Sequence, residues 1–359
     1  MTDKSLNNSG ADSVKRGPMK RRLFLTCLVG SAAAGLTAWK LTGSAAGSGR
    51  PGSLGTGGWV RVNRSTQALG TQVTLTVLHR DRKEAEEAIE EAFRELGRVE
   101  DVMSLYRPDS QLCQLNRTGL LEAPHPYLIE VLQSARNLSE RTDGAFDVTV
   151  QPLWQLYSEA TAAGVRPAPE ALQAVLATVD WRRIEIRPDR VRINGQGTRI
   201  TLNGNAQGYA ADTVKRILRS HGISNALIDT GEIEAVGQAS GERDWRIGIK
   251  HPRKPGDFLG LASLQDRALA TSGDYETRFS EDYGMNHLID PKTGRSPADL
   301  SSVSITAPTA LQADALSTAV YVLGLKKGRR LVESTPGTDA LFVTKQGAME
   351  RTDGFPFVG

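Results

Sequence analysis

Asp314 and Thr318 are the two residues whose types and spacing most directly suggest chemistry. They stand four residues apart in the run ADALST, residues 313–318, and this spacing places both side chains on one face of a helix. A carboxylate and a hydroxyl are hard oxygen donors that suit Mg²⁺, which keeps several waters and completes its octahedron with substrate phosphate oxygens. In the structural alternative, Asp314 favours a helix N-terminus and Thr318 bonds back to the helix backbone.

A glycine-punctuated turn provides a second candidate. Residues 201–212, TLNGNAQGYAAD, follow the order strand, turn, helix. Glycine lets the backbone approach a ligand closely, and a new helix N-terminus presents unpaired N–H groups to an anion. The segment is therefore compatible with a phosphate cradle. It is equally compatible with a tight turn that needs glycine only for its dihedral angles.

Two further clusters lie between these segments in the chain. One is ATSGDY, residues 270–275, and the other is HLIDPKTGR, residues 287–295. His287 is one of only five histidines and sits beside a charged loop rich in turn residues, where functional groups tend to lie. A hydrogen-bonded histidine with a purely structural role is the alternative.

Several other chemistries find no support in the sequence. It has no Cys/His set spaced for zinc, no GxSxG elbow and no complete P-loop. Of the two cysteines, Cys27 lies in the N-terminal leader, so Cys113 alone remains and no intrachain disulfide is expected in the mature chain.

The N-terminal leader, residues 1–46, predicts that the protein is exported. The first 46 residues hold seven basic and two acidic side chains, a charge of +5, so the rest of this +3 chain carries −2 and nucleic acid is not an expected partner. Arg21 and Arg22 directly precede an apolar stretch of residues 23–39, and small residues follow at 44–46, as in a twin-arginine signal peptide. An uncleaved membrane anchor is the alternative. We expect a signal over 1–46, a flexible Gly/Ser spacer over 47–58, a domain over 59–359, and a periplasmic location.

Hydrophobic periodicity predicts an α+β fold in which mixed sheets are flanked by helices. Its 359 residues, with 39% hydrophobic and 24% charged side chains, can build a packed core. Strands are expected at 71–77, 199–202, 226–229, 233–236, 245–250, 302–306 and 340–344. Helices are expected at 85–103, 126–140, 208–221, 311–323 and 327–333.

Together these segments resemble the FAD:protein FMN transferase family, also called ApbE, over nearly the whole chain after the leader. Each block alone is weak, but their common order is specific. The similar blocks are Gly70-Thr71, MSLYRPDS at 103–110, GAFDVTV at 144–150, the glycine turn at 203–212, TSGDY at 271–275, HLIDPKTGR and ADALST. The resemblance also implies a single catalytic unit with a core similar to the T-fold.

The family resemblance assigns roles to particular residues. It implies that Asp314 and Thr318, with the main-chain carbonyl of Ala206, hold Mg²⁺ against the FAD pyrophosphate, and that His287, Asp290 and Asp314 are catalytic. It implies that a threonine hydroxyl of a client flavoprotein attacks the FMN phosphorus, and AMP leaves. The flavin contacts that it implies are Gly70, Tyr106, Ala145, Phe146, Asp147, Gly204, Gln207, Thr271, Ser272, Gly273 and His287.

Two departures from the family pattern point to a branch within it. Gln207 stands where many members have Lys or Glu, and residues 229–233 read DTGEI where many have two glycines. With the twin-arginine leader, these variants resemble the NosX branch associated with nitrous-oxide respiration, whose expected client is the membrane flavoprotein NosR. Two alternatives to the transferase stay open: a metal-dependent FAD pyrophosphatase and a carrier that holds FAD intact.

Overall fold

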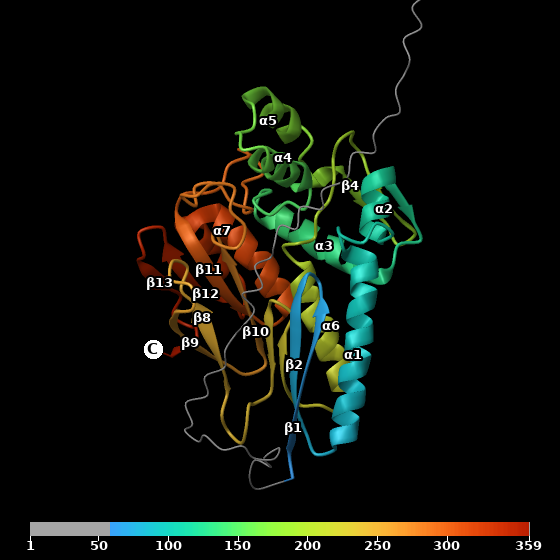
Figure 1. Ribbon diagram of the computed structural model, residues 1–359, viewed down its shortest axis with the longest axis vertical. Helices are drawn as coiled ribbons and strands as arrows, with labels where there is room; N and C mark the ends of the chain where they lie inside the picture. Colours follow the sequence, from blue (N-terminus) through green and yellow to red (C-terminus); the bar gives the residue numbers. More distant parts are fainter. Residues whose placement is uncertain (1–57, 359) are drawn as a thin grey trace, which may run out of the picture.

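The computed structural model describes residues 58–358 (Figure 1). The predicted signal peptide, 1–46, and all but the last residue of the predicted spacer lie outside this range. None of the described helices combines the length and the apolar character that crossing a membrane requires.

An eight-stranded sheet forms the centre of the molecule, and each neighbouring pair of its strands is antiparallel. In spatial order the strands are β1 (Val60–Ala68), β2 (Thr71–His79), β6 (Asn225–Asp229), β7 (Ile233–Val236), β10 (Arg267–Gly273), β11 (Leu300–Ala307), β12 (Asp339–Thr344) and β13 (Met349–Arg351).

Helices cover one face of this sheet and a small sheet covers the other (Figure 1). The helical layer is α1 (Arg82–Met103), α6 (Ala206–Ser220) and α7 (Ala310–Glu333). The covering sheet has the order β14 (Phe357–Val358), β9 (Phe258–Leu264), β8 (Trp245–Lys250).

The remaining elements gather at one end of the helical layer, where α4 and α5 lie beyond α3 (Figure 1). They are α2 (Gln111–Thr118), β3 (Leu120–Glu122), α3 (Pro126–Arg141), α4 (Gln151–Ala162), α5 (Pro169–Leu176), a 3₁₀ turn (Trp181–Arg183), β4 (Ile184–Ile186) and β5 (Arg190–Ile193).

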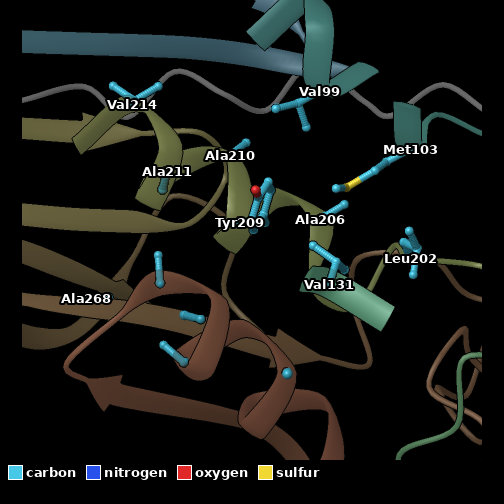
Figure 2. Close-up of a cluster of buried hydrophobic side chains, with 14 of the residues drawn as sticks. Val99, Met103, Val131, Leu202, Ala206, Tyr209, Ala210, Ala211, Val214 and Ala268 are labelled. Carbon is cyan, nitrogen blue, oxygen red and sulfur yellow. The ribbon is translucent and has the colours of Figure 1, made fainter. Parts of the chain in front are cut away.

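Successive side chains of a strand point to opposite faces of the sheet. The central strands carry buried residues at consecutive positions, so both faces of the sheet are covered. In β10, Ala268 and Ala270 join the core on the helix side, whereas Leu269 packs with Trp245 of the small sheet. Figure 2 shows α6 within the helix-side core; the labelled neighbours of its first turns come from α1 (Val99, Met103), α3 (Val131) and the preceding turn (Leu202).

The α+β prediction is confirmed, but one local prediction needs correction. The predicted strand at 199–202 is wrong: Arg199 forms only an isolated bridge with Val150, and the side-chain amide of Asn116 bonds to both main-chain groups of Ile200, at 2.7 and 2.8 Å. The two helices predicted at 311–323 and 327–333 are both present within α7, where non-helical backbone at Gly324, with φ of 73°, separates them.

Glu234 of β7 is a charged residue inside the helix-side core. Its side chain is 0% exposed, and Lys215 of α6 lies 2.7 Å from one carboxylate oxygen. Loss of solvation raises the pKa of Glu234 to about 7, although the Lys215 charge acts in the opposite direction. The neutral form of Glu234 therefore persists to a higher pH in the folded protein than in the unfolded chain.

Glu234→Gln is expected to become less destabilising, relative to wild type, as the pH rises. With a folded pKa of about 7 and an unfolded pKa near 4.5, the contribution of Glu234 to stability is complete below pH ~4.5 and is lost as the pH rises through 7. Between pH 5.5 and 8, the free energy of unfolding of the variant should increase by about 2 kcal/mol relative to that of wild type. Urea unfolding of both proteins at the two pH values measures this, and an identical difference at both would contradict it.

Candidate active site

The junction of α6 and α7 fixes the position of Asp314. A Cβ on Gly208 would lie 2.3 Å from the Ala310 carbonyl oxygen and 2.8 Å from the Asp314 Cβ, so only glycine permits this approach. The Gly208 N–H donates to Asp314 Oδ2 at 2.9 Å. The Asp212 carboxylate accepts the N–H groups of Ala310 and Leu311, at 3.0 and 2.9 Å, and so caps α7 from α6. The first two turns of α6 therefore hold both the start of α7 and the Asp314 carboxylate.

Four segments distant in the sequence meet around Thr318, one helical turn beyond Asp314. The Ser272 hydroxyl of β10 lies 3.4 Å from Thr318 Oγ1 and 2.7 Å from the Ser317 hydroxyl. A Cβ on Gly204 would lie 3.3 Å from Thr318 Oγ1 and 3.4 Å from the Phe146 ring. The glycine turn, the TSGDY strand, the GAFD segment and the ADALST helix thus form one cluster, as their common order in the sequence suggested.

The cluster brings two buried carboxyl groups close together. Asp314 is 4% exposed, and loss of solvation raises its pKa to about 7. Glu232 faces it: loss of solvation and the Asp314 charge raise the pKa of Glu232 well above its usual value, while the Thr271 N–H donates to its carboxylate. Among the described residues, no basic side chain is a main cause of either shift. Two such carboxylates without a cationic partner form a site that would attract a cation.

Glu232 is a member of this cluster that the sequence did not reveal as functional. The sequence showed only that a glycine of the family pattern is absent from residues 229–233. A spacing rule cannot find such a residue, because Glu232 and Asp314 are far apart in the sequence and come together only in the folded chain, where Glu232 accepts the Thr271 N–H of β10.

Main-chain contacts also shape the glycine turn. The Thr230 hydroxyl donates to the Gln207 carbonyl oxygen at 3.0 Å. A Cβ on Gly231 would lie 2.7 Å from the Gln207 amide nitrogen, so the Gln207 side chain rests against this glycine. Ala206, at the first position of α6, is 9% exposed. The 229–233 turn is therefore in contact with the first turn of α6.

His287 lies on a separate loop and is held in its neutral form. Loss of solvation lowers its pKa, so the neutral ring is favoured. Its Nδ1 lies 3.3 Å from the Thr277 carbonyl oxygen, which can only accept a hydrogen bond. The proton therefore belongs on Nδ1, and Nε2 retains a lone pair. Within the described residues, no hydrogen bond joins His287 directly to Asp314.

The carboxylates of Asp290 and Asp147 are engaged in local turns. Asp290 accepts the Lys292 N–H at 2.9 Å and the Thr293 hydroxyl at 3.1 Å. The buried Asp147 accepts both donors of Thr149, at 2.7 and 2.6 Å, and the Trp181 N–H at 3.0 Å. Both residues therefore shape the backbone beside Ile289 and Phe146, and their contacts with substrate stay predictions.

The predicted flavin contacts at the N-terminal end of the site are linked through Glu100. Gly70, with φ of 74°, closes the β1–β2 hairpin next to Leu69, whose N–H donates to Glu100 at 2.9 Å. Arg107 pairs with the other oxygen of Glu100 at 2.5 Å. The neighbouring Tyr106 side chain is 77% exposed and therefore accessible to a planar ligand.

The other predicted contacts are packed within the fold. Thr271 shares a hydrogen bond of 2.8 Å with Ser304 of β11. A Cβ on Gly273 would lie 2.3 Å from the Tyr275 ring, so glycine is required there. Ala145 is 8% exposed. Within residues 58–358, no group of three or more His, Cys, Asp or Glu side chains is arranged to hold a metal.

Comparisons with known proteins define the class of this fold and site. The profile of the ApbE family matches residues 69–342. An FAD:protein FMN transferase of Treponema pallidum (strain Nichols) is 33% identical over 315 residues, which cover 80% of this chain and 86% of the relative. One of Escherichia coli (strain K12) is 28% identical over 300 residues, covering 80% and 85%.

Solved structures agree with these sequence matches. The flavin transferase ApbE from Vibrio cholerae has a TM-score of 0.73 at 29% identity, covering 84% of this chain and all of that one (100%). The ApbE protein from Thermotoga maritima has a TM-score of 0.74 at 30% identity, covering 82% and 97%. The chain belongs to the ApbE family.

Proposed function

We propose that this protein is an Mg²⁺-dependent FAD:protein FMN transferase that attaches FMN through a phosphoester to a threonine of a client flavoprotein and releases AMP. The main support is the cluster of Asp314, Thr318 and Ser272 against the first turn of α6. Relatives that match over most of the chain are named FAD:protein FMN transferases. The family makes the protein a transferase.

The residues of the cluster fit a hard divalent ion. Asp314, Thr318 and the Ala206 carbonyl supply oxygen donors, and the carboxyl groups of Asp314 and Glu232 have no cationic partner among the described residues. With so few protein ligands, the rest of the coordination would come from water and pyrophosphate oxygens. When bound, Mg²⁺ would neutralise charge on the phosphoryl oxygens.

The first turn of α6 offers further groups to a phosphate. Asn205, which precedes α6, is 0% exposed, and neither polar atom of its amide has a partner among the described residues. A buried amide without a partner costs about 1–3 kcal/mol. This cost supports the proposal that a ligand approaches the turn, where the α6 N-terminus also favours an anion.

In the proposed transfer, the client hydroxyl oxygen forms a bond to the FMN phosphorus as the bond from that phosphorus to the oxygen of AMP breaks. Nε2 of His287 accepts the hydroxyl proton, since its lone pair is free while Nδ1 is held toward the Thr277 carbonyl. AMP departs with the bridging oxygen. Water in place of the threonine would give free FMN and AMP instead.

The client and the compartment are further parts of the proposal. The twin-arginine leader supports export to the periplasm. Gln207 and Glu232, at positions where many members of the family differ, support the NosX branch and hence the membrane flavoprotein NosR as the client. A periplasmic domain of that protein would present the acceptor threonine.

Incubation with FAD, Mg²⁺ and a purified threonine-bearing client domain tests this function. The expected result is a client whose intact mass increases by one FMN, with one AMP released per FMN attached. A client variant with Ala at the acceptor position should gain no mass. Equal amounts of free FMN and AMP, with an unmodified client, would instead identify a pyrophosphatase, and intact FAD in every mixture would identify a carrier.

A further inference from the structure

Helices α4 and α5 form a small hydrophobic cluster apart from the main core. Its buried members are Leu153 and Tyr157 of α4 and Ile289 of the loop that follows His287. The partly buried side chains around them are Leu172, Val175, Leu176, Val179, Phe279 and Met285. The cluster thus joins α4 and α5 to the segments on both sides of His287.

Tyr157 contacts both of these segments. Its ring stacks on Phe279, with 5.7 Å between centroids and 21° between planes. Its hydroxyl donates to the Gly294 carbonyl oxygen at 2.7 Å. One side chain, itself 8% exposed, therefore connects the chain before His287 to the turn after it.

The two contacts lie within short hydrogen-bonded turns that carry the catalytic loop. Before His287, the Phe279 N–H donates to the Met285 carbonyl at 2.8 Å, and the His287 N–H donates to Thr277 at 3.0 Å. After it, the Gly294 N–H donates to the Asp290 carbonyl at 2.8 Å.

Gly294 also packs closely on α5. Its φ is +67°, and a Cβ there would lie 2.8 Å from a methyl carbon of Leu172. Residues 277–295 contain no helix or regular strand, so most of their order must come from contacts such as these.

We propose that Tyr157 is a positioning residue for the flavin transfer, which holds His287 in place through its ring against Phe279 and its hydroxyl on the Gly294 carbonyl. This inference rests on the function proposed above. In this role Tyr157 acts through the loop that carries His287 and not by contact with FAD or the reacting phosphorus. Its effect is on the geometry of the base, and displacement of a catalytic group by a fraction of an ångström lowers the rate of the chemical step.

Tyr157→Phe tests the hydroxyl while keeping the ring in place. We expect kcat for FMN transfer to fall about tenfold with KM for FAD within about twofold of wild type, because chemistry rather than binding is affected. Amide hydrogen exchange in residues 277–295 should accelerate in the variant. The matched control is Tyr127→Phe, which removes a hydroxyl that donates to Glu95 at 2.6 Å between α3 and α1.

The outcomes separate this inference from the function on which it rests. Unchanged kcat in Tyr157→Phe, or an equal loss in Tyr127→Phe, would overturn the positioning role. Unchanged exchange in residues 277–295 would overturn it as well. A wild-type protein that transfers no FMN to any client would instead refute the proposed function.

Discussion

Asp314→Asn is expected to lower the rate of FMN transfer by about 10²–10³-fold while the protein stays folded. The substitution keeps the volume of the side chain and removes the buried charge that the proposed divalent ion needs. Electrostatic stabilisation of the transferring phosphoryl group has effects of this size in other enzymes. AMP release in the presence of FAD, Mg²⁺ and client, measured by chromatography, gives the rate.

The control for Asp314→Asn is the same change at Asp339. Asp339 pairs with Arg267 at 3.0 Å and begins β12, at the end of that strand opposite the site. Asp339→Asn should transfer FMN at the wild-type rate. If both variants kept wild-type activity, Asp314 would have no part in catalysis.

Gly208→Ala is expected to lower both stability and activity. The new Cβ would lie 2.3 Å from the Ala310 carbonyl oxygen, so α6 and α7 must separate and the hydrogen bond from residue 208 to Asp314 must lengthen. Overpacking of this kind costs about 1–3 kcal/mol, more than the ~1 kcal/mol that alanine gains over glycine in a helix. Displacement of Asp314 should reduce transfer by about a hundredfold.

Gly97→Ala is the matched control for this substitution. Gly97 lies within α1, and a Cβ there would meet nothing within 4 Å. The same change should therefore raise stability by up to ~1 kcal/mol and leave transfer unchanged. Urea unfolding and the AMP assay of both variants give the comparison. A Gly208→Ala protein as stable and active as Gly97→Ala would show that the close helix contact is dispensable.

The parts of the site that depend on short-range spacing could be predicted from the sequence. Asp314 and Thr318 share a face because one helical turn separates them. The glycine-rich composition before α6 predicts a turn followed by a helix, and both are present. These patterns depend only on residues close together in the sequence, so they can be recognised without knowledge of the tertiary contacts.

Features that depend on distant partners could not be predicted. Residues 199–202 alternate in burial as a strand does, yet Asn116, far away in the sequence, takes the hydrogen bonds of Ile200. Gly208 allows the contact of α6 with α7, a role that the turn itself does not reveal. Glu232 approaches Asp314 only in the folded chain, where the Thr271 N–H of β10 donates to its carboxylate. These contacts follow from the arrangement of the sheet.

Anomalous diffraction from crystals of the protein soaked with Mn²⁺ and FAD tests the metal site most directly, because Mn²⁺ accepts the same hard oxygen ligands as Mg²⁺. The expected result is an anomalous peak bonded to the Asp314 carboxylate, Thr318 Oγ1 and an oxygen of the FAD pyrophosphate. A pyrophosphate bound away from the start of α6, with no peak beside Asp314, would contradict the proposed chemistry.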